Sequence, residues 1–267
     1  LGGDINLGNL SFGDTTEPYG FGGFNSRLTV VAGASADAAS RLVREKILNV
    51  AAHVLEVSRE TLHLEAGLVS VADSNQFITF SDLAKLAEGL PGYSLPGIKS
   101  PGLSATESVI IEGMTYSNGC CIAVVEVDVE TCAVDVKELH LTHDCGRMIN
   151  PMMVEGQIFG GLAHGLGNAL YEKMVFDETG QPLSTTLADY LLVTAAEIPS
   201  ITLDHYENVS PLNALGAKGV GESGVIPTAA AIASAVEDAI KDLGVRITSV
   251  PITPQDLHAR ISDTQYE

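Results

Sequence analysis

Tryptophan is absent from this sequence, and aromatic residues make up only 5% of it. Basic residues are also scarce, since 14 lysines and arginines stand against 34 aspartates and glutamates, for a formal net charge of −20. Nucleic acids and anionic membrane surfaces bind clustered positive charge, so this composition argues against both as partners. It indicates an acidic, well-hydrated surface.

The four cysteines include no Cys-x-x-Cys pair, which argues against a zinc or iron–sulfur site built by this chain alone. No residue is assigned as a metal ligand. A disulfide framework is not expected in a chain of this length. Cys120 and Cys121 lie in an apolar, strand-like run and are predicted to be buried thiols.

No segment resembles a signal peptide or a membrane span, and a cytoplasmic location is expected. The Ala-rich run over 229–235 is short and is soon followed by Glu237 and Asp238. Because the first residue is Leu rather than Met, the chain is interpreted as processed, trimmed or one piece of a larger polypeptide.

Hydrophobic periodicity predicts an α+β chain. Residues 1–34 and 91–118 are rich in Gly, Pro or Ser and are predicted to be irregular. Ser81 is expected to cap the second helix, and two subdomains are considered, about 1–145 and 146–267. Helices are predicted over 36–57, 82–88, 154–176, 227–243 and 254–261, and strands over 62–64, 68–71, 77–79, 122–129, 134–142, 201–206 and 245–252.

The helix predicted over 154–176 contains an unusual number of glycines. Each glycine inside a helix costs roughly 0.5–1 kcal/mol relative to alanine, so five of them need a reason. Close packing against another backbone or against a bulky ligand would supply one. The five are Gly156, Gly160, Gly161, Gly165 and Gly167.

A Gly-x-Gly-x-x-Gly pattern runs from Gly219 to Gly224. A dinucleotide-binding fingerprint needs a strand directly before it, whereas residues 211–218 are typical of a loop, so NAD binding is disfavoured. The pattern does bring Glu222 close to the beginning of a helix, where free N–H groups favour an anion. Spacing alone leaves Glu222 either as a partner of the helix N-terminus or as a general base beside a metal centre.

Four segments resemble, in order, the xanthine dehydrogenase and aldehyde oxidase family of molybdenum hydroxylases. The resemblance covers nearly the whole chain and points to the C-terminal half of the molybdopterin-binding catalytic subunit. Cys132 and His164 depart from the residues common in that family. The four segments are residues 13–27, residues 123–128 with 143–151, residues 154–172 and residues 215–227.

The resemblance implies an α+β molybdopterin-binding domain with mixed sheets and packed helices. It implies a molybdenum cofactor on molybdopterin, expected in the cytosine dinucleotide form. Arg27 is suited to phosphate because its fork bonds bidentately, although a surface salt bridge is its alternative role. The residues implied to bind the cofactor are Phe24, Ser26, Arg27, Thr29, Val31, Ala32, Gly33, Gln157, Lys218, Gly219, Val220 and Gly221.

The family's chemistry implies oxidative hydroxylation of an electron-poor carbon in an N-heterocycle, purine or aldehyde, with oxygen taken from water. Glu222 would be the catalytic base, taking a proton from a hydroxyl group that the metal acidifies. Electrons would leave through iron–sulfur clusters and FAD on partner subunits. A carbon monoxide dehydrogenase and a catalytically silent structural subunit remain the alternatives.

The family's catalytic subunit also has an N-terminal half, which this sequence does not contain. The chain is hypothesised to be a split subunit that needs a complementary N-terminal polypeptide, with residues 91–118 in the interface. His143 and His164 are interpreted as structural, and Asp144 and Asn150 as turn residues.

Overall fold

The computed structural model describes residues 2–3, 6, 8–89 and 101–264. The chain forms two units, each with its own core. The first unit consists of Leu1–Gly22 and Val31–Ile111, and the second of Gly23–Val30 and Glu112–Glu267. The chain therefore divides elsewhere than near residue 145, the boundary considered from the sequence.

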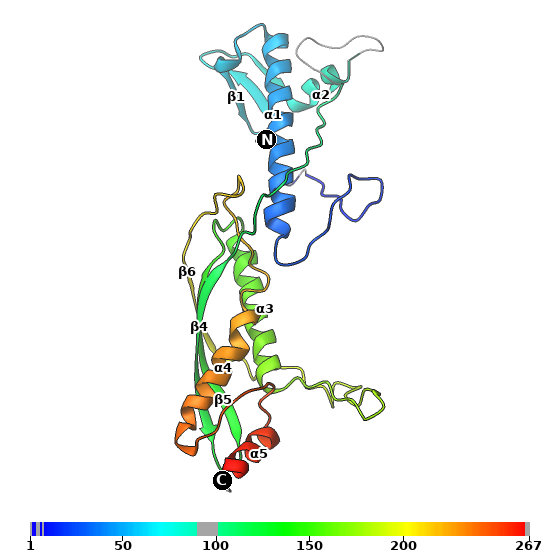
Figure 1. Cartoon of the computed structure of the whole chain (residues 1–267). Helices are drawn as coiled ribbons and strands as arrows, with labels where there is room; N and C mark the ends of the chain where they lie inside the picture. Colours follow the sequence, from blue (N-terminus) through cyan, green and yellow to red (C-terminus); the bar gives the residue numbers. More distant parts are fainter. Residues whose placement is uncertain (1, 4–5, 7, 90–100, 265–267) are drawn as a thin grey trace. The chain divides into compact units, whose positions relative to one another are not determined.

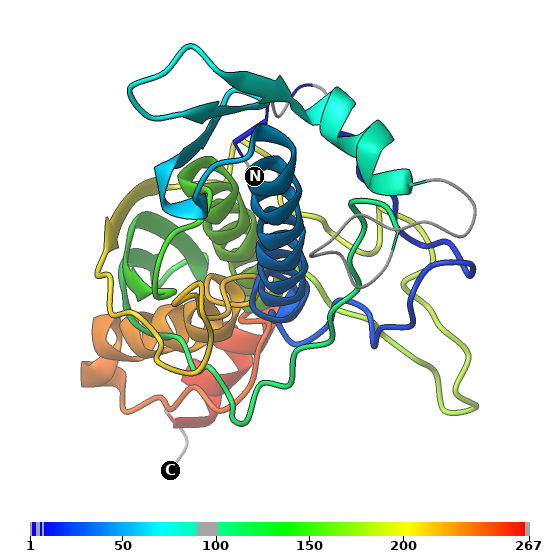
Figure 2. The ribbon, with the colours of Figure 1, turned by 90° about the horizontal axis from the view of Figure 1, so that it is seen from above.

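The first unit packs two helices against a small antiparallel sheet. The sheet has the order β1-β2-β3, and both β1 and α2 contact α1 (Figures 1 and 2). Val50, Ala51, Val69 and Leu83 are fully buried in its core. The elements are η2 (Thr29–Gly33, which begins in the second unit), α1 (Ala34–Leu55), η3 (Arg59–Thr61), β1 (Leu62–Glu65), β2 (Leu68–Val71), β3 (Phe77–Thr79) and α2 (Phe80–Glu88).

The cap of α2 is Thr79 rather than Ser81. The Thr79 hydroxyl accepts a hydrogen bond from the backbone N–H of Asp82 at 3.1 Å. Thr79 has the extended backbone that an N-cap needs, whereas Ser81 already lies inside the helix.

The second unit is built on a mixed sheet with the order β4-β5-β6. Strands β4 and β5 form an antiparallel hairpin, and β6 pairs with β5 in parallel. Helix α4 packs against both β4 and α3 (Figure 1). The elements are β4 (Asn118–Asp128), β5 (Ala133–Asp144), α3 (Pro151–Leu170), β6 (Ser200–His205), α4 (Val225–Ala239), η4 (Lys241–Leu243) and α5 (Pro254–Thr264).

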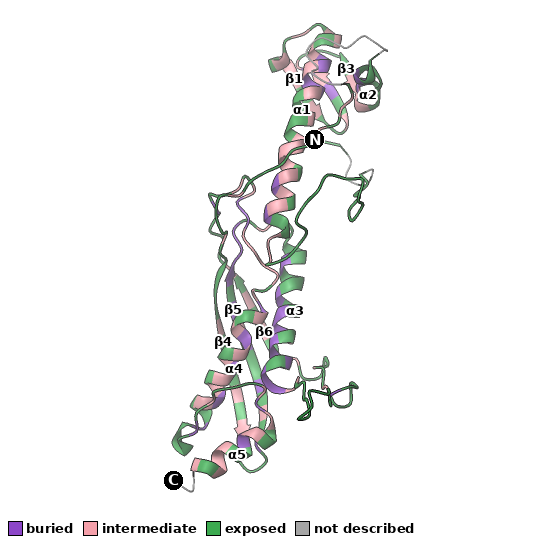
Figure 3. Cartoon of the chain, turned by 45° about the vertical axis from the view of Figure 1, so that its right-hand side comes forward, coloured by how far each residue is buried: buried purple, intermediate pink, exposed green. Residues whose placement is uncertain are grey.

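Glycines permit the close crossing of α3 and α4. A Cβ atom placed on Gly161 would lie 2.9 Å from the Cα of Gly224, and one on Gly165 would lie 2.5 Å from the Cβ of Thr228. Nothing lies within 4 Å of such an atom on Gly156 or Gly160. Buried residues run along α3 (Figure 3). Close packing against α4 therefore explains two of the five glycines, against backbone at Gly161 and against the Thr228 side chain at Gly165.

One expected helix end and one expected strand of the second unit are wrong. Helix α3 ends at Leu170 instead of near residue 176, because the chain turns back and the Glu172 N–H bonds to the Gly167 carbonyl at 2.8 Å. Residues 245–252 do not form a strand. Their backbone bonds instead to the neighbouring helices, with Ile247 N donating to the Glu237 carboxylate and Ile252 N to the Ala169 carbonyl.

The four cysteines are all free, and the expectation that Cys120 and Cys121 are both buried is wrong. Cys120 is exposed and Cys121 is half-buried, because successive residues of a strand point to opposite faces of the sheet. Burial raises the pKa of the Cys121 thiol.

The segment predicted to be irregular begins, over 91–100, outside the described residues. Its described part, 101–117, contains no helix or strand, as expected. Within the described ranges, no helix has the length and apolar character that crossing a membrane requires.

Candidate functional site

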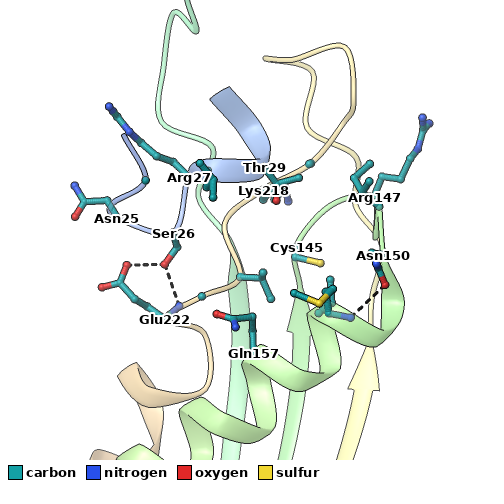
Figure 4. Close-up of a pocket in the computed structure, with 18 of the residues that line it drawn as sticks. Asn25, Ser26, Arg27, Thr29, Cys145, Arg147, Asn150, Gln157, Lys218 and Glu222 are labelled. Carbon is teal, nitrogen blue, oxygen red and sulfur yellow. Dashed lines mark hydrogen bonds between the residues drawn. The ribbon is translucent and has the colours of Figure 1, made fainter. Parts of the chain in front are cut away.

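A pocket of about 580 Å³ opens in the second unit (Figure 4). Its walls come from the loop before α1, the segment that joins β5 to α3, the first turns of α3 and the segment before α4. The lining residues are 23–29, Cys145, Arg147, Ile149, Asn150, Met153, Val154, Gln157, Ala217, Lys218, Val220, Gly221 and Glu222.

Glu222 is held at the edge of this pocket by Ser26 (Figure 4). The Ser26 hydroxyl donates to Glu222 Oε2 at 2.6 Å and accepts from the Glu222 backbone N–H at 2.9 Å. Ser26 reaches this position because Asn25 and Ser26 both have positive φ, 52° and 53°, and Arg27 N donates to the Phe24 carbonyl at 3.3 Å. These features define a type I′ turn. The turn therefore presents one hydroxyl to both polar groups of Glu222.

The glycines before Glu222 let this turn approach. A Cβ atom on Gly219 would lie 2.8 Å from the Ser26 carbonyl oxygen, too close for any side chain. One on Gly221 would lie 3.3 Å from Ser26 Oγ and 3.6 Å from Gln157 Oε1. The absence of a side chain at Gly219 therefore allows the close contact with the backbone of Ser26.

Lys218 and Asp144 form a buried ion pair behind the pocket wall. Lys218 Nζ lies 2.6 Å from Asp144 Oδ2, and both side chains are more than nine-tenths buried. Gly146 N and Asn208 N also donate to Asp144 Oδ1, at 2.8 and 3.2 Å. Burial alone would raise the pKa of Asp144, but the hydrogen bond from Lys218 and those two N–H groups hold it below its ordinary value. Asp144 is thus an ion-pair partner as well as the turn residue expected from the sequence.

Two arginines face the pocket without a carboxylate partner within the described ranges. The Arg27 guanidinium stacks 4.1 Å above the Phe24 ring, and its Nε is buried with no hydrogen-bond partner. Arg147 lies on the segment between β5 and α3. Asp144 already compensates the charge of Lys218, so the two arginines stand against one carboxylate, Glu222, and the pocket favours an anion in a strongly acidic chain.

His143 is buried at the end of β5, and its Nε2 lies 3.1 Å from Ser223 Oγ. Its Nδ1 has no hydrogen-bond partner. Burial lowers the pKa of His143, and the nearby His205 lowers it further. His164, the other histidine interpreted as structural, is exposed on α3. No group of three or more potential metal ligands occurs in the described part of the chain.

The pocket gathers most of the residues predicted for the site. Gly219 lies in the same segment, against Ser26. Val31, Ala32 and Gly33 are not among the lining residues and belong to the first unit. Those that line it are Phe24, Ser26, Arg27, Thr29, Gln157, Lys218, Val220, Gly221 and Glu222.

Sequence reasoning missed ten lining residues, among them Cys145, Arg147, Asn150 and Met153. The available signal for the first three was the run from His143 to Pro151, which was identified as a family segment but whose residues were not assigned to the site. Asn150 does act locally, because its side chain accepts from Met153 N at 3.3 Å and caps α3.

Comparison with protein families identifies the class to which this fold and pocket belong. Residues 7–199 match the model of the molybdopterin cofactor-binding domain. The match covers more than half of the chain, so the chain belongs to this family. The resemblance to the molybdenum hydroxylases and the α+β fold expected from it are thereby confirmed.

Individual relatives narrow the comparison. The chain is 37% identical over 244 residues to the 6-hydroxypseudooxynicotine dehydrogenase complex subunit gamma of Paenarthrobacter nicotinovorans, covering 91% of this chain and 30% of that one. It is 41% identical to the carbon monoxide dehydrogenase large chain of Hydrogenophaga pseudoflava, with 90% and 30% covered. The quinoline 2-oxidoreductase structure from Pseudomonas putida 86 matches with a TM-score of 0.82 and 40% identity, over 93% of this chain and 32% of that one. The chain thus spans about 30% of the length of these relatives.

Proposed function

We propose that this chain is the cofactor-binding part of a molybdenum hydroxylase subunit, with Glu222 as its catalytic base. The reaction is oxidative hydroxylation of an electron-poor carbon in an N-heterocycle, purine or aldehyde, with oxygen from water. The observation that carries the proposal is the Glu222 carboxylate fixed by Ser26 at the edge of a cation-lined pocket. Family membership and the dehydrogenase and oxidoreductase names of the relatives support it.

The pocket suits an anionic, hydrogen-bonding cofactor. Its volume is about 580 Å³, and the buried Nε of Arg27 is a donor without a partner. In this proposal Arg27 and Arg147 bind the phosphates, and Ser26 and Gln157 bind the pterin. The cytosine dinucleotide form is proposed. Val31, Ala32 and Gly33 remain candidates from the family resemblance, together with Phe24, Thr29, Lys218, Gly219, Val220 and Gly221.

Glu222 has one carboxylate oxygen engaged and the other available. Oε2 accepts from Ser26, whereas no hydrogen bond in the described part of the chain engages Oε1. When bound, the molybdenum cofactor supplies a redox centre that takes two electrons from the substrate. Glu222 Oε1 would accept the proton that must leave the attacking oxygen as this oxygen bonds to the substrate carbon. Ser26 keeps the carboxylate in one orientation while this proton moves.

The full enzyme is proposed to need further chains. This chain spans about 30% of its relatives, and one of them is described as a complex subunit. We propose a complementary N-terminal molybdopterin subunit, an iron–sulfur subunit and an FAD subunit as partners, acting on a small-molecule substrate. A cytoplasmic location remains part of this proposal.

Replacing Glu222 with Gln tests the role of the base. Gln keeps the size and can still accept from Ser26, but it cannot take the proton. We expect turnover of the assembled complex to fall by about 10²- to 10⁴-fold, with molybdenum content unchanged. Glu178→Gln, in an exposed turn, is the matched control and should leave turnover unchanged. Full activity of the Glu222→Gln complex would refute the proposal.

Carbon monoxide oxidation is the second candidate, because a carbon monoxide dehydrogenase large chain is 41% identical. Assays of the assembled complex with carbon monoxide and with a panel of N-heterocycles, purines and aldehydes distinguish the two reactions. A silent structural subunit is the remaining alternative, and it predicts no molybdenum in the purified complex.

A further inference from the structure

His143 is a buried, titratable side chain to which the proposed reaction assigns no part. It is 2% exposed, and within the described residues its side chain makes one hydrogen bond, between Nε2 and Ser223 Oγ at 3.1 Å. Ser223 follows the base Glu222 directly in the chain. Its backbone N–H also donates to the Val220 carbonyl at 3.1 Å and closes the turn that carries the base. His143 therefore connects the end of β5 with the turn that presents Glu222.

In the described part of the chain, Ser223 is the only hydrogen-bond partner of the His143 side chain. The His205 ring lies edge-on, with its centroid 6.3 Å away, and neither of its ring nitrogens has a hydrogen-bond partner among the residues that the structure describes. Glu155 Oε1 lies 3.9 Å from His205 Nε2, on the side of the second ring. Asp144, the next residue in β5, is already paired with Lys218.

We propose that His143 is a positioning residue that, through Ser223, holds Glu222 in its working orientation. Ser26 fixes the carboxylate and the N–H of Glu222 from the loop side, at 2.6 and 2.9 Å. His143 fixes the next residue from the sheet side. The base is therefore held at two adjacent points by residues far apart in the sequence. This inference rests on the proposed function of Glu222 as the base.

The test uses four variants in the assembled, molybdenum-loaded complex: Ser223→Ala, His143→Leu, the double variant, and His143→Gln. We expect Ser223→Ala and His143→Leu each to lower kcat about tenfold, the effect of losing one hydrogen bond worth about 1.4 kcal/mol. KM and molybdenum content should stay unchanged. Because both substitutions remove the same hydrogen bond, kcat of the double variant should be no lower than kcat of either single variant.

Rescue and control variants separate positioning from general damage. The side-chain amide of His143→Gln can donate to Ser223 Oγ, so it should recover most of the lost kcat. His140→Leu makes the same change as His143→Leu on the same strand, at a half-exposed site paired with Glu138, and should leave kcat unchanged. A crystal structure of the Ser223→Ala complex should show Glu222 Oε2 beyond about 3.5 Å from Ser26 Oγ, outside hydrogen-bond range.

Three results would overturn the inference: wild-type kcat in Ser223→Ala, additive losses in the double variant, or an unmoved Glu222 in the Ser223→Ala crystal structure. Ser223→Ala removes only a hydroxyl, so it tests the positioning role of the bond to His143 even where His143→Leu fails to fold. Glu222→Gln is measured in parallel. Activity retained there removes the proposed base, whereas an inactive Glu222→Gln beside a fully active Ser223→Ala removes only the positioning role.

Discussion

The crossing of α3 and α4 gives a prediction with an internal control, because glycines of one helix lie in opposite environments. Gly156 and Gly160 face open space, whereas a Cβ on Gly161 would meet the backbone of α4's first residues at 2.9–3.0 Å. Alanine gains about 1 kcal/mol of helix propensity over glycine at any interior position. That gain is common to every Gly→Ala substitution in α3, so it cancels when the variants are compared. The remaining difference in free energy of unfolding is the cost of overpacking, about 1–3 kcal/mol.

Gly161→Ala should have an overpacking cost at the upper end of this range, because the neighbouring atoms belong to the backbone and cannot move aside as a side chain can. Gly165→Ala meets the Cβ of Thr228, which is fully buried and whose hydroxyl donates to the Gly224 carbonyl at 2.6 Å. Thr228 therefore resists turning away. We expect Gly156→Ala to raise the free energy of unfolding and Gly161→Ala to lower it.

Urea unfolding followed by circular dichroism measures these changes as shifts of the transition midpoint at constant slope. Gly160→Ala, beside Gly161 in the sequence but open, is the closest control. A Gly161→Ala midpoint that rises as far as that of Gly160→Ala would refute the close crossing.

Two further predictions concern buried ionisable groups. Asp144→Asn leaves the Lys218 charge buried without its partner, so it should cost about 3–5 kcal/mol of stability at neutral pH. The pKa of Asp144 is lowered in the folded protein, so the ionised carboxylate stabilises the fold above pH 3.8, and this stabilisation is lost as pH falls through the folded pKa. The difference in free energy of unfolding between the wild type and Asp144→Asn should therefore become smaller in acid. The folded pKa of His143 is lowered from 6.5, so stability should fall as pH drops below 6.5, by at most about 1.4 kcal/mol per pH unit from this group. Melting temperatures of wild type and His143→Gln across this range check it, and equal pH slopes would contradict it.

Local pattern predicted the elements whose residues interact mainly with sequence neighbours. Strands β2 and β3 match their expected bounds, since alternation and flanking turns define both ends. The predictions are wrong where backbone N–H groups form hydrogen bonds with residues distant in the sequence. Residues 245–252 have strand-like composition, but their N–H groups bond to α3 and α4, which no local pattern records.

The candidate site shows the same limit. Its segments were identified by family resemblance, and the glycines near Glu222 were predicted to line the cofactor, which stays a prediction. Pairings between remote residues were not foreseen: Asp144 with Lys218 and His143 with Ser223 are 74 and 80 positions apart. A single sequence contains no information on which buried polar groups meet across such separations.

The bond between Ser26 and Glu222 joins positions 196 residues apart. During translation, the loop around Ser26 leaves the ribosome long before the wall that completes its pocket. A nascent chain therefore has no finished cavity until residue 222 has emerged and α4 has docked. A ligand that occupies this pocket must therefore bind after the second unit has folded, and not to the unfolded chain.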